Sequence, residues 1–180
     1  EVGSDTIRRA HKVHPIADLQ IEYSLVSRGI EDDILKTCRE LGIGVTAYGV
    51  LARGLISGHW SKDHAGARDF RLMSPRFQAG NIDANLALAD RLRGIAGEIG
   101  ASPAQVAIAW VAAQGTDIVP LVGARRRERL TEALGARDVK LTAAHLAALA
   151  EAFPPGAAAG GRYPEEHLRH MDSEKPAVVS

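Results

Sequence analysis

The sequence predicts an α/β fold in which helices cover a parallel sheet. Three short apolar segments, residues 17–25, 43–51 and 118–123, have the composition of buried strands. Amphipathic helical patterns separate them, and a strand joined to the next strand through a helix runs parallel to it. Three strands cannot close a barrel by themselves, because an eight-stranded (β/α)8 barrel typically needs about 250 residues. The 180 residues suffice for one domain with a sizeable core.

The composition is that of an ordinary soluble globular protein, with 46% hydrophobic and 24% charged residues. The 22 basic residues balance the 22 acidic ones, which argues against a nucleic-acid partner. No apolar run approaches the roughly 20 residues that a membrane span needs, so we expect no membrane contact. The single cysteine, Cys38, excludes a disulfide framework, and a reducing cytoplasmic location is the natural expectation.

The first half of the chain contains two predicted helices and two predicted strands. The helix over 4–13 has Ser4 or Asp5 as its cap. The strand over 17–25 alternates apolar and polar residues, and the strand over 43–51 follows a helix over 30–41. Residues 52–82 then form a long mixed connection, and connections of that length are commonly functional or disordered.

The second half is mainly helical. A helix is expected over 83–99, and Ser102 with Pro103 and Gln105 marks the start of the next one, which runs to about residue 114. A helix over 125–134 follows the third strand, and Thr142 caps a last helix that Pro154 ends. We expect one domain over 1–155, followed by a tail over 156–180 that is rich in Gly, Ala and Pro and wraps the surface.

An arginine cluster follows the third strand directly. Gly123 is followed by the arginines of 125–127 and by Arg129, where a strand passes into a helix. Ligands of parallel α/β folds collect at the carboxyl ends of strands, and free N–H groups at a helix start suit a phosphate. Guanidinium groups can bind phosphate with two hydrogen bonds each. Pairing of these arginines with Glu128 and Glu132 on a solvated helix face is an equally good explanation.

The end of the second strand carries an aromatic residue and a glycine-rich segment. Tyr48 could stack on a flat ligand, and Arg53 could meet a pyrophosphate. Gly49, Gly54 and Gly58 permit tight turns or close backbone approach. A core tyrosine followed by an ordinary turn would give the same pattern.

Gln20 is a polar residue on a strand that we expect to be buried. A buried amide needs hydrogen-bond partners, and either a ligand amide or a structural partner would serve. The seven histidines show no metal-binding spacing, and no Walker loop, GxGxxG or GxSxG motif occurs.

Taken together and in order, three segments resemble the aldo-keto reductases over nearly the whole chain. HPIADLQIEYSLVSRGIEDDIL resembles the sixth strand and following helix of that family, GIGVTAYGVLARGLISG its seventh strand and cofactor loop, and IVPLVGARRRERLTEAL its eighth strand and the next helix. The AYGVLARG and RYPEEH motifs resemble a bacterial NADP-dependent branch. The resemblance implies the C-terminal portion of a TIM (β/α)8 barrel, with about three parallel strands and surrounding helices.

The resemblance also implies a cofactor, NADP(H), bound across the barrel mouth without a Rossmann domain. Tyr48 would stack on the nicotinamide and Gln20 would hold its carboxamide. The adenosine 2′-phosphate would meet Gly123, Arg125 and Arg129, which favours NADPH over NADH because an extra phosphate rewards nearby cations. The pyrophosphate would be lined by Gly49, Val50, Leu51, Arg53 and Gly54.

Two positions depart from the common pattern of the family. Glu1 stands where many members have an Asn that touches the carboxamide, although this branch commonly has Glu there. Ala133 stands where many members have an Asn against the adenine, which removes that expected contact.

The catalytic residues of the family are absent from the matched segments. Its Asp, Tyr, Lys and His tetrad comes from the first four strands, and the Tyr donates a proton while hydride passes to a carbonyl carbon. Tyr23, Tyr48 and Tyr163 match other family positions. The chain therefore resembles the C-terminal half of an NADPH-dependent reductase of aldehydes or ketones, from just after strand five, and we expect it to be inactive alone. The alternative is a non-catalytic truncated NADP-binding module or one piece of a split barrel.

The resemblance implies a small-molecule carbonyl substrate whose identity these residues do not reveal. It also implies a protein partner, either the missing N-terminal half of the barrel or a second copy of the chain. Unpaired sheet edges and uncovered apolar faces favour association, so we expect the isolated chain to be marginally stable and to aggregate or oligomerise.

Overall fold

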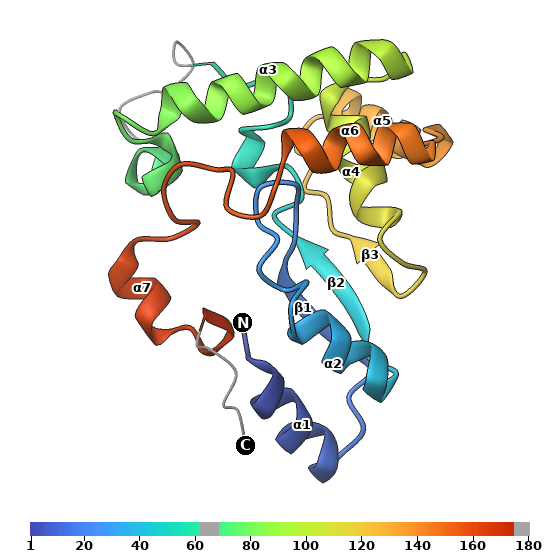
Figure 1. Cartoon of the computed structure of the whole chain (residues 1–180), viewed down its shortest axis with the longest axis vertical. Coiled ribbons are helices and arrows are strands. Elements are labelled where there is room, and N and C mark those ends of the chain that lie inside the picture. Colours follow the sequence, from blue (N-terminus) through green and yellow to red (C-terminus); the bar gives the residue numbers. More distant parts are fainter. Residues whose placement is uncertain (62–68, 175–180) are drawn as a thin grey trace.

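The structure is a computed structural model that describes residues 1–61 and 69–174 (Figure 1). The three strands are β1 (Asp18–Glu22), β2 (Gly44–Tyr48) and β3 (Ile118–Pro120). The helices are α1 (Ser4–Val13), α2 (Ile34–Leu41), α3 (Ile82–Ile99), α4 (Pro103–Ala112), α5 (Arg127–Leu134), α6 (Ala143–Ala152) and α7 (Glu165–His170). Short 3-10 turns are η1 (Ala52–Gly54), η3 (Phe70–Met73), η4 (Pro75–Phe77), η5 (Gly135–Asp138) and η6 (Asp172–Glu174).

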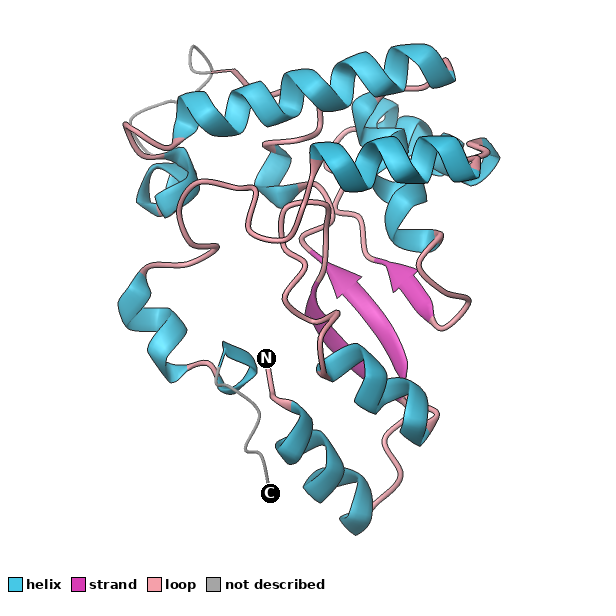
Figure 2. Ribbon diagram, in the orientation of Figure 1, coloured by secondary structure: helices cyan, strands magenta, loops and turns pink. Residues whose placement is uncertain are grey.

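The strands form one parallel sheet in the order β1-β2-β3, which confirms the predicted class. Leu19 lies opposite Val45, and Val45 lies opposite Ile118, so the apolar positions of all three strands share one face. In Figure 2, α1 and α2 lie near one end of the strands, and α3 to α6 gather near the other. The crossovers between the strands are helical, as the alternation of patterns predicted.

One face of the sheet is the core. Ile21, Val45, Ala47 and Ile118 are buried there, against the apolar sides of α2 and α4. In α4 almost every residue from Ala104 to Val111 is buried, so this helix is enclosed on all sides. Burial of this kind stabilises the fold by roughly 25 cal/mol for each Å² of apolar surface removed from water.

Among the described residues, the opposite face is largely open except at its carboxyl end, where Glu22 is buried. Gln20 is exposed, Val119 is 60% exposed, and Leu121, just past β3, is 50% exposed. Ile21 and Glu22 of β1 are buried, but our expectation that Gln20 is a buried amide is wrong. The reason is that Gln20 pairs in register with Thr46 and shares its face, whereas Leu19 and Ile21 turn toward the helices.

The helix-start predictions hold at two sites and fail at one. Ser102 and Gln105 form a capping box at α4, with the Ser102 Oγ accepting from the Gln105 N–H at 3.2 Å. Thr142 likewise caps α6, with His145 as its reciprocal partner. At α1 neither Ser4 nor Asp5 is the cap. Gly3 takes that position, and its N–H donates to Asp172 Oδ2 at 2.8 Å.

The tail contains more regular structure than its composition predicted. It leaves α6, arcs away and returns toward the N-terminus through α7 and η6 (Figure 1). Residues 62–68 of the predicted long connection and 175–180 of the predicted tail lie outside the described residues. Within the described ranges, no single helix is long and apolar enough to cross a membrane, although α3 and α4 pass that test as a pair bent by 85°.

The exposed sheet face predicts that the chain associates with itself and that a charged side chain placed on this face weakens the association. We expect Val119→Lys to shift the purified chain toward monomer by about tenfold in its association constant, because a charged side chain resists burial at an interface. Val13→Lys on α1 is the control, since Val13 is equally apolar and 89% exposed but lies away from the sheet. Sedimentation velocity measures both. Equal association of the two variants would contradict a role for this face.

Candidate cofactor site

A cleft of about 440 Å³ lies at the carboxyl ends of β2 and β3. The segment after β2, the segment after β3, and the facing sides of α4 and α5 form its walls. The lining includes most of the residues predicted for the cofactor, namely Gly49, Val50, Leu51, Arg53, Gly54, Gly123 and Arg129. Segments some 70 residues apart in the sequence are thus brought together in one cleft.

Three predicted site residues are not part of this lining. Arg125 is exposed in the turn that precedes α5. Tyr48 is half-buried at the end of β2, one residue before the cleft begins, and Gln20 lies on the uncovered sheet face. The α5 helix begins at Arg127, later than the predicted 125, so Arg125 belongs to the loop.

The backbone after β2 turns sharply. Gly49 has a φ of +68°, and Ala52 and Arg53 have φ values of 49° and 58°, in the left-handed region that residues with a Cβ rarely adopt. Such strained residues concentrate at functional sites. At Gly49 a Cβ would also lie 3.0 Å from Glu22 Cγ, so any other residue would be strained and would crowd that side chain.

Arg129 has features of both alternatives that the sequence left open for the arginine cluster, pairing with a glutamate on the helix and a position at a ligand site. Its Nη1 lies 3.1 Å from Glu132 Oε2, so it is paired on the helix, and it also lines the cleft. His59 Nε2 lies 2.8 Å from the same carboxylate. Burial alone would raise the pKa of Glu132, but hydrogen bonds with Ser102, His59 and Arg129 outweigh it and lower the pKa.

Sequence reasoning did not identify His59 as part of the site. His59 and Glu132 are 73 positions apart, so no local spacing could reveal their contact. The pairing of Glu132 with Arg129 at a spacing of three was visible in the sequence, but the entry of Glu132 into the cleft was not.

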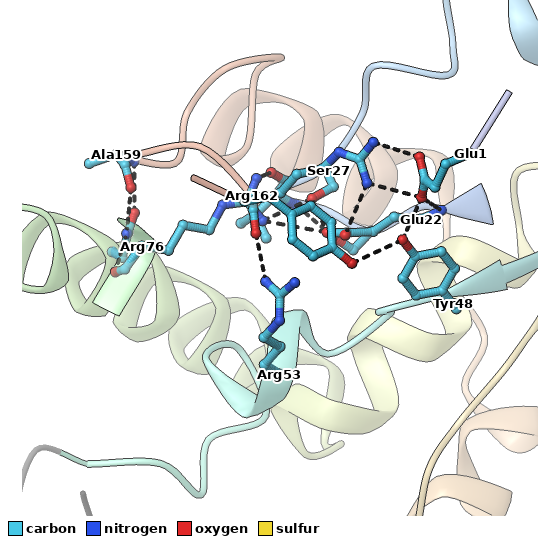
Figure 3. Close-up of polar contacts among 12 residues, drawn as sticks. Glu1, Glu22, Ser27, Tyr48, Arg53, Arg76, Ala159 and Arg162 are labelled. Atoms are coloured by element: carbon cyan, nitrogen blue, oxygen red, sulfur yellow. Dashed lines mark hydrogen bonds and ion pairs between the residues drawn. The ribbon is translucent and has the colours of Figure 1, made fainter. Parts of the chain in front are cut away.

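A second polar group surrounds the hydroxyl of Tyr48 (Figure 3). This hydroxyl donates a short hydrogen bond to Glu1 and lies 3.3 Å from the hydroxyl of Tyr163. Arg162 of the tail donates to both Glu1 oxygens, at 2.6 and 3.0 Å. Burial and the bond to Glu1 raise the pKa of Tyr48, so its hydroxyl keeps its proton at neutral pH.

Glu22, at the end of β1, is the most buried acid of this group, at 5% exposure. It lies between two guanidinium groups, 3.4 Å from Arg162 Nη1 and 3.8 Å from Arg76 Nη1. Ser27 Oγ donates to it at 2.7 Å. Burial lowers the pKa of Arg76, and the nearby Glu22 opposes that change. A buried carboxylate needs such partners to remain charged.

The parallel sheet with a cleft at its carboxyl edge is the architecture of part of a (β/α)8 barrel, and solved structures agree. The chain superposes over its full length on half of a glycerol dehydrogenase from Gluconobacter oxydans, with a TM-score of 0.78 and 26% identity. It also superposes, over 84% of its length and 46% of the other chain, on a thermostable aldo-keto reductase solved with the inhibitor epalrestat, with a TM-score of 0.62 and 23% identity. The second likeness concerns the fold alone.

The chain belongs to the aldo/keto reductase family, whose family model matches residues 1–153. Over 163 residues it is 45% identical to a protein named "Probable aldo-keto reductase 1" from Glycine max. That match covers 91% of this chain and 47% of the relative, so the chain spans about half the length of the curated relative. Membership of the bacterial NADP-dependent branch remains a prediction.

The environment of Glu1 predicts a pH dependence of stability. Burial alone would raise the pKa of Glu1, but hydrogen bonds from Arg162, Tyr48 and Ser173 outweigh it and lower the pKa from 4.5 to about 2. Because the folded-state pKa is depressed, Glu1 stabilises the fold above its unfolded pKa, and this contribution disappears as the pH falls toward 2.

We therefore expect Glu1→Gln to lower the free energy of unfolding by roughly 1–2 kcal/mol at pH 7, after allowance for solvent screening. The gap between variant and unsubstituted chain should shrink as the pH falls below about 4.5. Urea unfolding between pH 7 and 3 measures it, and a gap that stays constant with pH would show that the Glu1 charge does not carry the effect.

Proposed function

We propose that this chain is the cofactor-binding C-terminal half of an NADPH-dependent aldo/keto reductase, an oxidoreductase that reduces aldehydes or ketones to alcohols. The observation that carries the proposal is the cleft in which the strained loop after β2, Gly123 and Arg129 meet. When bound, NADPH supplies the hydride. This chain's own residues would bind and orient it.

The lining of the cleft suits a phosphate-bearing, partly apolar cofactor. Five residues of the loop after β2 line the cleft, namely Gly49, Val50, Leu51, Arg53 and Gly54, and sharply turning loops of this kind suit a pyrophosphate. Arg129 would meet the 2′-phosphate, with Arg125 able to approach from the adjoining loop. A phosphate would compete with Glu132 for the Arg129 guanidinium. Ala133 also lines the cleft, and its methyl group offers no hydrogen bond to an adenine.

The nicotinamide end would extend from the cleft toward Tyr48. Tyr48 is the last residue of β2 and directly precedes Gly49, so a cofactor that occupies the loop reaches it next. Gln20 lies two residues before Glu22 on β1, and Glu22 pairs in register with Tyr48. Gln20 is exposed, and among the described residues its side-chain amide makes no hydrogen bond. It therefore remains free to hold a carboxamide.

The proton donor of the reaction would come from outside this chain. Tyr23 is buried and donates to Glu31 at 2.7 Å, and burial with that bond raises its pKa. Tyr48 is committed to Glu1. We propose that the remaining half of the barrel supplies the catalytic residues and covers the sheet face of Thr46 and Val119, and that the protein acts on a small carbonyl compound in the cytoplasm. A non-catalytic NADP-binding module or one piece of a split barrel is the second candidate, favoured by the open sheet face.

Titration of the purified chain with NADPH and NADH, followed by cofactor fluorescence, tests the proposal. We expect NADPH to bind more tightly than NADH. Replacing both Arg125 and Arg129 with Ala should weaken NADPH binding by about tenfold or more and change NADH binding little, because each charged hydrogen bond contributes about 1.5–3 kcal/mol.

The matched control is the Arg126→Ala, Arg127→Ala double variant. It removes the same charge from the same segment, but neither side chain lines the cleft. Equal losses in the two double variants would mean that net charge, not the cleft, attracts the cofactor. Absence of saturable binding to the unsubstituted chain would contradict a cofactor site formed by this half alone.

A further inference from the structure

The tail is fastened to the body of the protein first at Ala159. The buried Asn85 of α3 accepts from the Ala159 N–H at 2.8 Å and donates to the Ala159 carbonyl at 2.9 Å. Gly160 follows with a φ of +80°, and a Cβ there would lie 2.9 Å from the Pro75 carbonyl oxygen. The path of the tail is therefore fixed up to Gly160, independently of the residues beyond it.

Arg162 forms the second fastening point, and it is 11% exposed (Figure 3). Beyond its two bonds to Glu1, its Nε donates to Glu174 at 2.8 Å and its Nη1 to Glu22 at 3.4 Å. Burial alone would lower the pKa of Arg162, but Glu1, Glu174 and Glu22 outweigh it and raise the pKa. One guanidinium thus joins the start of the chain, the end of β1 and the turn η6.

Only arginine suits this position. Its fork of donors is planar and fixed, so it can serve three carboxylates that approach from different directions. A lysine keeps the charge but presents it as a point. Removing the guanidinium would leave Glu1 without its guanidinium partner and Glu22 with Arg76 alone, in a poorly solvated place, which costs more than losing a surface ion pair.

Arg53 connects this fastening to the cofactor cleft. It lines the cleft, and its Nη1 donates to the Arg162 carbonyl at 2.8 Å. The Arg53 guanidinium also lies 4.6 Å from the centre of the Tyr163 ring, a distance typical of a cation–π contact. Tyr163 in turn reaches the Tyr48 hydroxyl. The tail therefore contacts Tyr48, which directly precedes the cleft, and Arg53, which lines it.

We propose that Arg162 is a positioning residue that fastens the tail over the carboxyl edge of the sheet and holds Tyr163 against Tyr48 and Arg53, so that release of this fastening governs how fast the cofactor leaves. The second half of this inference rests on the proposed function. The first half concerns the chain alone.

Hydrogen exchange of the tail, followed by mass spectrometry on the full chain, tests the fastening without any cofactor. We expect Arg162→Ala to speed exchange in residues 161–174 by about tenfold or more, because a buried ion group is lost, and Arg162→Lys to restore part of the protection. Arg169→Ala is the control. It lies in the same tail, but its ion pair with Glu165 is long, at 3.6 Å, and exposed.

Stopped-flow release of NADPH tests the effect on the cleft. We expect Arg162→Ala to raise the dissociation rate constant by about fivefold or more while Arg169→Ala leaves it unchanged. A variant that merely destabilised the whole fold would speed hydrogen exchange in the core as well as in the tail. The exchange rate of α4 therefore serves as the internal reference.

Unchanged tail exchange in Arg162→Ala would overturn the proposal. Faster tail exchange with an unchanged release rate would overturn its link to the cofactor. If the unsubstituted chain binds no NADPH, the proposed function fails, and the exchange data alone decide whether Arg162 fastens the tail.

Discussion

The contact of Arg162 with Glu1 and Glu22 is the interaction on which the arrangement of the site depends. It joins three parts of the chain that are distant in sequence, since the contact with Glu1 spans 161 positions and that with Glu22 spans 140. Glu22 occupies its place because Gly49 leaves room beside it, and Gly49 also begins the turn that forms the cleft. The same buried carboxylate therefore adjoins both the cofactor loop and the tail.

Buried ion pairs of this kind are weak stabilisers, because desolvation of the charges offsets much of their attraction. Their value here is geometric. A cluster with several carboxylates and a fixed guanidinium has few alternative arrangements, so the tail takes one path. The general stability of the chain comes instead from the apolar face of the sheet, where Ile21, Ala47 and α4 pack. Apolar burial therefore stabilises the core, whereas ion pairs and hydrogen bonds fix the position of the tail.

Much of the fold was visible in the sequence because local patterns determine it. Apolar alternation predicted the strands, and the Ser102 capping box fixed the start of α4. The cofactor loop and Arg129 were predicted from a family resemblance, and the structure brings them into one cleft. The burial of Gln20 was predicted wrongly, since periodicity does not show which face other elements cover. Contacts over long separations, such as His59 with Glu132 or Arg162 with Glu1, leave no local signal, and they make up most of what the sequence did not reveal.

The most direct test of the account is hydrogen exchange of the chain with and without saturating NADPH. The account predicts added protection in two separate segments, residues 49–59 after β2 and residues 121–133 around Gly123 and α5, with little change in α1 and α2, which lie away from the cleft. Protection in both segments together would show that they form one cofactor site. Protection in neither, or in only one of them, would contradict the cleft as the place where the cofactor binds.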